Sequence, residues 1–296
     1  MADWIVVEAP TSAGSHHAGQ ELAPAALRAR GLFERLTEAG MTIVDTVALP
    51  PTPFLPAARE PSGRDAARVT AVAASVADAV EAALRRPARV LVVGGDCTVS
   101  VGMIAGLVRV EPESFVAYLD GDADLADPAT SAGGIMDASG VATLLGLIDS
   151  PLGHLGPRHP LLTDIALAML GFDTTDPGAY DEQALAQLPG LIAGSDHAVR
   201  ANPERYADLV RARMDAAAAS AVHFDVDSID SGELPLANFP HYGTGIGLRD
   251  AAQLLGRLLA APSLRAVSLT EVNPTHDVDG RYLDAYVRLV TDAFAG

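Results

Sequence analysis

Short apolar runs alternate with longer segments of helical periodicity along this chain, and this alternation limits the possible folds more than any other feature. Most of the runs are apolar throughout, as in strands that are covered on both faces. The expected strands are Ile5–Val7, Thr42–Val47, Val90–Val93, Phe115–Leu119, Ile165–Leu170, a short strand near Leu191, Ala221–Val226 and Ala266–Leu269. We therefore predict an α/β fold of three layers, α/β/α, around a mostly parallel central sheet.

Helices are expected between these strands. The first has Pro24 near its start and Gly40 at its end, which are typical helix-start and helix-stop residues. The expected helices are Leu22–Ala39, Ala66–Arg86, Val99–Val108, Val141–Ile148, Asp181–Leu188, Pro203–Ala219, Arg249–Leu259 and Arg281–Ala295. Residues 50–64, rich in Pro, and residues 120–139 should form loops. The sequence shows no internal repeat and no low-complexity tail, so residues 1–296 are expected to form a single domain.

The composition indicates a globular protein of the cytoplasm. Hydrophobic residues make up 49% of the chain, yet no apolar segment reaches the roughly 20 residues of a bilayer span, so no membrane helix is expected. The N-terminus lacks the basic and apolar regions of a secretory signal. The single cysteine, Cys97, excludes an internal disulfide and fits a reducing compartment.

The chain is acidic, with a formal net charge of −18, and all 20 of its basic residues are arginine. This balance argues against a nucleic-acid partner, because phosphate binding needs clustered positive charge. It favours a cationic small-molecule substrate, since an acidic protein attracts cations. The same composition is also typical of GC-rich genomes, so the alternative of no functional meaning stays open.

Carboxylates follow several of the predicted strands directly. Asp120, Asp122 and Asp124 come after one strand, and Asp225 and Asp227 end another. A single Asp-x-Asp is common as a turn or helix cap. However, the carboxyl ends of parallel strands meet at one edge of a sheet, where ligands bind. Together these residues predict a polynuclear cation site.

Five motifs occur in the order in which one known family carries them, and on these motifs the chain resembles the ureohydrolases, which include arginase, agmatinase and formimidoylglutamase. The resemblance covers most of the chain. Gly94-Gly-Asp-Cys97 is similar to the family's Gly-Gly-Asp-His, and Asp120-Gly-Asp-Ala-Asp124 to its Asp-Ala-His-x-Asp. The other three are Phe224-Asp-Val-Asp-Ser-Ile-Asp230, Gly245-Ile-Gly-Leu248 and Thr270-Glu-Val-Asn-Pro274.

The resemblance implies two Mn²⁺ ions at the carboxyl edge of the sheet and, in most members, a trimer or hexamer. Transferred position by position, it implies that one ion is held by Cys97, Asp120, Asp124 and Asp225. It implies that the other is held by Asp120, Asp122, Asp225 and Asp227. Glu271 matches a glutamate that binds the guanidinium of the substrate.

Both histidine ligands of the family motifs are replaced here, one by Cys97 and the other by Asp122. Aspartate is a hard ligand that suits Mn²⁺, whereas a thiolate is soft and favours Zn²⁺ or Fe. Mn²⁺ is therefore the expected metal, with Zn²⁺ or Fe as alternatives.

Four further residues have more than one interpretation. Asp137 stands where family members carry a proton-shuttling histidine, so it could protonate a leaving amine, bind a substrate ammonium or cap a helix near Ser139. Asp176 could contact the α-amino group of a substrate or simply form a turn. His223 is expected to be a buried core histidine rather than a ligand. His241 could line the substrate pocket, but it is expected to lie in an exposed loop.

The leading hypothesis is a metal-dependent hydrolase that cleaves a C–N bond of a guanidino or amidino compound and releases urea or a substituted urea. A modified guanidine such as N-hydroxyarginine would suit the altered ligand set, because it brings its own oxygen ligand. The alternative is a relative without catalytic activity that keeps the fold as a binding or structural subunit. A third hypothesis, intermediate between these two, is a hydrolase that uses a single Zn²⁺ held through Cys97.

Overall fold

The computed structural model describes residues 3–56, 59–175 and 180–296 of the chain. Its main sheet has eight strands in the order β2-β1-β5-β10-β9-β6-β7-β8, and every neighbouring pair is parallel. The strands are β1 (Asp3–Ala9), β2 (Thr42–Ala48), β5 (Ala88–Gly94), β6 (Ser114–Leu119), β7 (Leu167–Phe172), β8 (Ile192–Ser195), β9 (Ala219–Asp225) and β10 (Leu264–Thr270). The predicted α/β fold with a parallel central sheet is confirmed.

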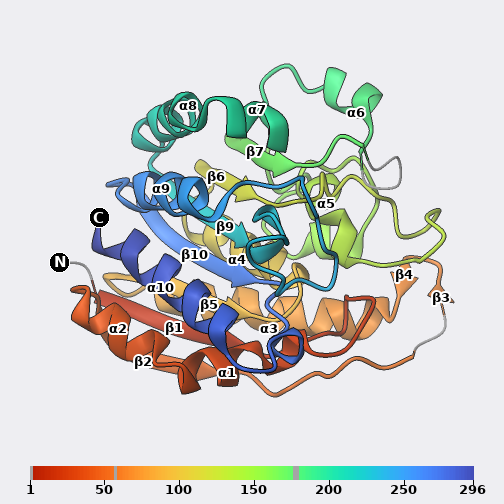
Figure 1. Cartoon of the computed structure of the whole chain (residues 1–296). Helices are drawn as coiled ribbons and strands as arrows, with labels where there is room; N and C mark the ends of the chain where they lie inside the picture. The colour runs from red at the N-terminus through yellow and green to blue at the C-terminus, as the bar shows by residue number, and fades with distance from the viewer. Residues whose placement is uncertain (1–2, 57–58, 176–179) are drawn as a thin grey trace.

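Helices cover both faces of this sheet and form the outer two layers (Figure 1). Along β1, Ile5 and Val7 belong to one apolar core, whereas Trp4 and Val6 belong to the other, because alternate side chains of a strand point to opposite faces. One core packs against α3 (Ala66–Leu84), α4 (Thr98–Val110) and α5 (Gly140–Leu144). The other packs against α1 (Ala23–Ala29), α2 (Leu32–Glu38), α7 (Asp196–Ala201), α8 (Pro203–Ala216), α9 (Leu248–Leu259) and α10 (Arg281–Ala295).

The expected helix over 22–39 is wrong as one element, since it is two helices, α1 and α2. Gly31 separates them with a φ of 76°, a left-handed conformation that an L side chain rarely adopts. The sequence also missed α7 and the small antiparallel pair β3 (Arg59–Glu60) and β4 (Gly63–Arg64) inside the expected loop 50–64.

Most other errors lie at the ends of elements. The strand expected from residue 165 begins at Leu167, after a short 3-10 turn (Asp164–Ala166). The helix expected to end at Ala219 ends at Ala216, and the strand expected from Ala221 begins at Ala219. Near the predicted helix at 181–188, α6 spans Glu182–Ala186. Within the described ranges, we find no helix long and apolar enough to cross a membrane.

Candidate metal centre

Four neighbouring strands of the sheet bring the predicted site residues together. β5, β10, β9 and β6 lie side by side, and each ends at the same edge in a loop that carries site residues. Cys97 follows β5 at the start of α4, Glu271 follows β10, Asp225 ends β9, and Asp120 follows β6. Cys97, Asp120, Asp124, Asp225, Asp227 and Glu271 are all buried, and Asp122 is partly exposed.

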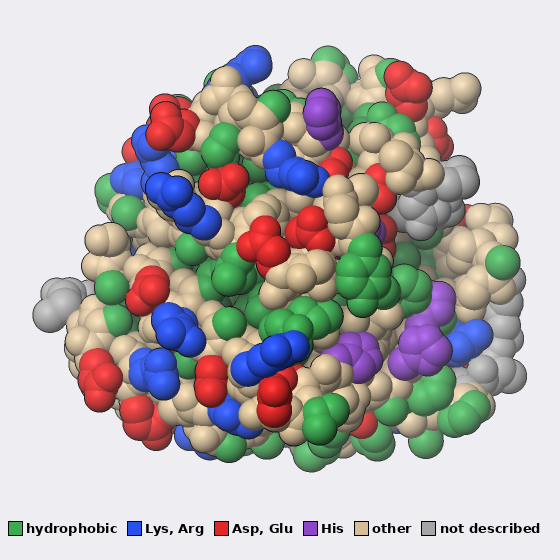
Figure 2. Space-filling view, viewed as in Figure 1, with side chains coloured by type: hydrophobic (Ala, Val, Ile, Leu, Met, Phe, Trp, Pro, Cys, Tyr) green, Lys and Arg blue, Asp and Glu red, His purple; other side chains and the backbone are tan. Residues whose placement is uncertain are grey.

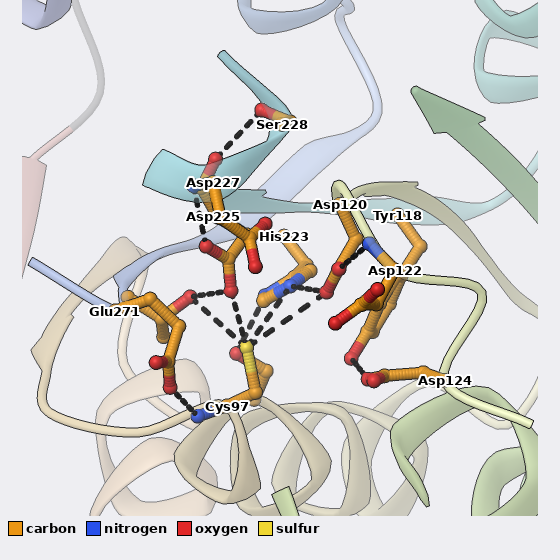
Figure 3. Close-up of polar contacts among 12 residues, drawn as sticks. Cys97, Tyr118, Asp120, Asp122, Asp124, His223, Asp225, Asp227, Ser228 and Glu271 are labelled. Carbon is orange, nitrogen blue, oxygen red and sulfur yellow. Dashed lines mark hydrogen bonds and ion pairs between the residues drawn. The ribbon is translucent and has the colours of Figure 1, made fainter. Parts of the chain in front are cut away.

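The first cluster consists of Cys97, Asp120, Asp225 and His223, which the sequence predicts as a core residue (Figure 3). The Cys97 Sγ atom lies 2.6 Å from Asp225 Oδ2 and 3.9 Å from Asp120 Oδ2. The His223 Nε2 atom lies 3.7 Å from the same sulfur and 3.3 Å from the same Asp120 oxygen. One sulfur, one nitrogen and carboxylate oxygens therefore face a common point.

His223 is fully buried, as expected of a core histidine, and it also borders the first cluster. Its Nδ1 atom lies 2.7 Å from Ser100 Oγ, and the ring packs against Tyr118 with centroids 3.9 Å apart. The opposite nitrogen points into the cluster. Burial lowers the pKa of His223 to about 3, so the ring is a neutral imidazole at physiological pH. The sequence held a signal for this position, because residues 223 and 225 share one face of a strand.

The second cluster consists of Asp122, Asp227 and His241. His241 Nε2 lies 3.6 Å from Asp122 Oδ1, and Asp227 Oδ1 accepts a hydrogen bond of 2.8 Å from Gly121 N. The prediction of an exposed loop for His241 is wrong, since only 9% of the residue is exposed. The loop that carries His241 has no periodic pattern, so the sequence could not predict where this side chain points.

Asp124 lies beside the first cluster, in the wall of a cavity that opens above it. Its Oδ2 atom accepts a 2.6 Å hydrogen bond from the Tyr118 hydroxyl, and its backbone has a left-handed φ of 51°. Such a conformation is uncommon for a residue other than glycine and is typical of functional sites.

Asp137 and Glu271 face each other at the start of α4. The Cys97 N–H donates to Asp137 Oδ1 at 2.7 Å and to Glu271 Oε1 at 2.9 Å, and the Gln20 side-chain amide donates to Glu271 Oε2. The interpretation of Asp137 as a cap of the helix near Ser139 is wrong, because its carboxylate reaches Cys97 instead. Gln20, at the start of a short 3-10 helix (Gln20–Leu22) far away in the sequence, could not be assigned this role from the sequence.

Negative charge dominates the electrostatics of the site. Burial, followed by repulsion between neighbouring carboxylates, raises the pKa of Asp120, Asp225 and Glu271 well above the ordinary range of a carboxyl. Burial and the same carboxylates raise the pKa of the Cys97 thiol. Buried carboxylates at this density cannot all ionise unless positive charge compensates them. The donor set of hard oxygens, imidazole nitrogens and one sulfur therefore fits divalent cations.

A cavity of about 280 Å³ opens above the clusters and is large enough for a small substrate. His16 and Phe239, which the sequence did not suggest, form part of its wall with their rings 4.5 Å apart. Burial lowers the pKa of His16 to about 4. Asp176, the predicted contact for an α-amino group, lies outside the described residues.

The chain is similar to known proteins over its whole length. The family model described as the arginase family matches residues 2–296. An arginase from Neurospora crassa is 30% identical over 288 residues, which are 92% of this chain and 79% of that protein.

Solved structures show the same fold. Arginase from Bacillus subtilis superposes with a TM-score of 0.86 at 22% identity, covering 99% of this chain and 98% of the other. A proclavaminate amidino hydrolase from Streptomyces clavuligerus superposes with a TM-score of 0.74 at 18% identity, covering 100% of this chain and 91% of the other. With its fold, its ordered motifs and the match over residues 2–296, the chain belongs to the arginase family.

Proposed function

We propose that this protein is a metal-dependent hydrolase that cleaves a C–N bond of a guanidino or amidino compound and releases urea or a substituted urea. The observation that carries the proposal is the group of buried carboxylates beneath a cavity of about 280 Å³, with Glu271 in the cavity wall. The names of the relatives, arginase and amidino hydrolase, support the same substrate class. By its resemblance to the family, we also propose a homo-oligomer.

The metal centre is proposed to hold two divalent cations. Cys97, Asp120, Asp124 and Asp225 would hold one, and Asp120, Asp122, Asp225 and Asp227 would hold the other, so that Asp120 and Asp225 would contribute to both. When bound, paired divalent cations activate water for attack on an electrophilic carbon. The preponderance of carboxylate oxygens favours Mn²⁺, whereas the Cys97 sulfur keeps Zn²⁺ or Fe as alternatives.

Glu271 is proposed to bind the cationic end of the substrate. Hydrogen bonds from the Cys97 N–H and the Gln20 amide fix the orientation of its carboxylate. A carboxylate held in this way pairs well with a planar guanidinium and keeps the carbon in position for attack.

Asp137 is proposed to donate a proton to the leaving amine. Burial, and then repulsion from Asp96 and Asp124, raises the pKa of its carboxyl well above the ordinary value, which keeps a proton available. Asp176 remains proposed as a contact for the α-amino group of the substrate.

An N-hydroxyguanidino amino acid is the proposed type of substrate, because its oxygen can serve as a ligand at a centre without the family's two histidines. The test is to assay protein purified without chelator against arginine, agmatine, formiminoglutamate and N-hydroxyarginine, with urea and substituted ureas measured as products. We expect turnover of N-hydroxyarginine to exceed that of arginine. Arginine turnover at an ordinary enzymatic rate of about 10 per second would contradict the substrate proposal.

The same preparation separates the enzyme from a binding or structural subunit. Elemental analysis should find two divalent ions per chain if the proposed function is right. Protein that stays metal-free in excess Mn²⁺ and hydrolyses none of the compounds would support the non-catalytic alternative.

A further inference from the structure

Two imidazoles reach the metal centre from places where the family motifs carry no ligand. We propose that His223 and His241 are metal ligands, His223 in the cluster with Cys97 and His241 in the cluster with Asp122. They replace, from other parts of the chain, the two histidines that are missing at positions 97 and 122. This inference rests on the proposed metal dependence but not on the identity of the substrate.

The geometry around His223 fits a shared ion. The three distances among Cys97 Sγ, His223 Nε2 and Asp120 Oδ2 are 3.9, 3.7 and 3.3 Å. Ligands at about 2.0–2.3 Å from a tetrahedral metal ion lie roughly 3.3–3.8 Å from one another. These three distances are therefore close to the spacing of ligands around one ion.

The hydrogen bonds of His223 leave the correct nitrogen free to bind. Ser100 Oγ donates to Ser268 Oγ at 2.9 Å, so it is available to accept from His223 Nδ1, which lies 2.7 Å away. In that tautomer Nε2 carries a lone pair and no proton. A lone pair that faces a thiol and a carboxylate is stabilised by a cation between them, and a ligating histidine is commonly held by its other nitrogen in this way.

His241 provides independent evidence at the second cluster. Among the described residues its Nε2 atom is buried and has no hydrogen-bond partner, although Asp122 Oδ1 lies 3.6 Å away. A buried polar atom without a partner is costly. The loop is anchored by two 3.0 Å hydrogen bonds between His241 and Ser231, so the ring is held at the cluster. A metal ion between Nε2 and the carboxylates of Asp122 and Asp227 would satisfy this nitrogen.

Gly121 makes room for the ring of His241. A Cβ atom at this position would lie 2.7 Å from His241 Cδ2 and 2.5 Å from Asp227 O. The family motif carries alanine here, so its methyl group would clash with an imidazole placed as His241 is. Gly121 and Asp122 thus differ from the family motif at two neighbouring positions, both beside His241, and Cys97 differs from it beside His223.

Metal binding tests the proposal without reference to hydrolysis. His223→Gln and His241→Gln would each be compared with wild type by elemental analysis after dialysis and by titration of the metal-free protein with Mn²⁺ and Zn²⁺. We expect each variant to lose one ion or to bind it at least about 100-fold more weakly, since loss of an outer-shell partner alone costs 10–100-fold. His197→Gln, an exposed histidine on α7, is the matched control and should bind like wild type.

Spectroscopy gives a second readout. Pulsed electron paramagnetic resonance of the Mn²⁺-loaded wild type should show coupling to imidazole nitrogen, reduced in each histidine variant and absent from the double variant. Two further variants cover the case in which the first ones fail to fold. Gly121→Ala should weaken one site by displacing His241, and Cys97→His combined with His223→Ala should bind metal more tightly than His223→Ala alone.

Each outcome has a separate meaning. Unchanged metal content, affinity and nitrogen coupling in both variants would overturn the ligand assignment, even if the wild type hydrolyses guanidino compounds. Loss of ions in the variants without any hydrolysis by the wild type would uphold the assignment and overturn the proposed function. A wild type that binds no divalent cation would overturn both.

Discussion

Glu271 adopts a backbone conformation that its side chain does not favour. Its φ is 64°, and its N–H donates to Gly95 O at 2.9 Å, which fixes this conformation. For a residue other than glycine, the left-handed region costs about 1–2 kcal/mol. The residue proposed to bind the guanidinium therefore stores strain in the folded protein, as residues at functional sites often do.

Two substitutions separate the charge of Glu271 from its strain. Glu271→Gln keeps the strain and removes the charge, so kcat/KM should fall about 10- to 150-fold, since hydrogen bonds to charged groups contribute about 1.5–3 kcal/mol. Glu271→Gly removes both, so activity should be lost while the free energy of unfolding of the metal-free protein rises by about 1 kcal/mol above that of Glu271→Gln. Enzyme kinetics and denaturant unfolding measure the two effects. A Gly variant no more stable than the Gln variant would show that no strain is released.

Among the single residues of the site, the sequence predicted the carboxylates that follow strands but did not predict His241 or Gln20. The order of apolar runs was enough to place Asp120 and Asp225 at one edge, because parallel strands end together. His241 and Gln20 could not be found in this way. Their positions depend on how the segments between strands and helices fold back over the sheet, and these segments have no repeating spacing from which this can be predicted.

Helix α4 links the site to the interior of the sheet. Its first turn carries Cys97 at the N-terminal boundary and, one turn later, Ser100, which contacts His223 on β9 and Ser268 on β10. The helix thus fixes the thiol and the imidazole relative to each other. A substitution on the buried face of α4 should therefore alter metal binding even though it replaces no proposed ligand.

Ser100→Ala tests this link. With only Ser268 Oγ, 3.3 Å from Nδ1, left to orient His223, metal affinity should fall about 10- to 100-fold. Calorimetric titration with Zn²⁺ and Mn²⁺ measures the change. Ser75→Ala, at an exposed hydroxyl on α3 that bonds only its own helix, is the control and should have no effect. Equal affinities in both variants would show that the hydroxyl does not hold the ring.

The bounds of helices and strands were predicted well where the apolar periodicity was clear. They were predicted poorly where a single backbone angle ends an element. β5, β6, β9 and β10 appear close to their expected bounds because each is built around a mainly apolar run. The break between α1 and α2 depends on the left-handed conformation of Gly31, which residue composition alone does not reveal. The apolar spacing continues across the break.

Across the whole molecule, negative charge is both spread over the surface and concentrated in the site. Figure 2 shows acidic and arginine side chains interspersed over the viewed face, without one large basic patch. The net charge of −18 favours the approach of cations. The carboxylates of the centre, however, oppose folding until cations compensate them.

Carboxyls with lowered pKa values make a protein more stable as pH rises. In the metal-free protein we expect the opposite, a loss of stability as pH rises. In the metal-free protein the buried carboxyls Asp120, Asp124 and Asp225 have raised pKa values, so the folded state holds more protons than the unfolded state above the ordinary carboxyl pKa of about 4. The free energy of unfolding should then fall as pH rises from about 5 to about 8. Thermal unfolding of chelator-treated protein measures this trend.

Added metal provides the control for the pH experiment. Mn²⁺ at about 100 times its Kd should stabilise the folded state by about 2.7 kcal/mol per site, or roughly 5 °C in Tm, at about pH 8. The decline of stability with pH should also become smaller. A metal-free protein that becomes more stable as pH rises would contradict this account of the buried carboxyls.

The position of β10 has a consequence for how the protein is made. This strand is the last in the chain but lies between β5 and β9, in the middle of the sheet (Figure 1). During synthesis, β2-β1-β5 and β9-β6-β7-β8 can pair among themselves, yet each group keeps an open strand edge until the ribosome has released residues 264–270. Cys97 belongs to one group, and Asp120 and Asp225 belong to the other. The candidate metal centre therefore lies across the gap that β10 fills. A nascent chain that stalls before β10 exposes the inner edges of β5 and β9 and has no complete site for metal.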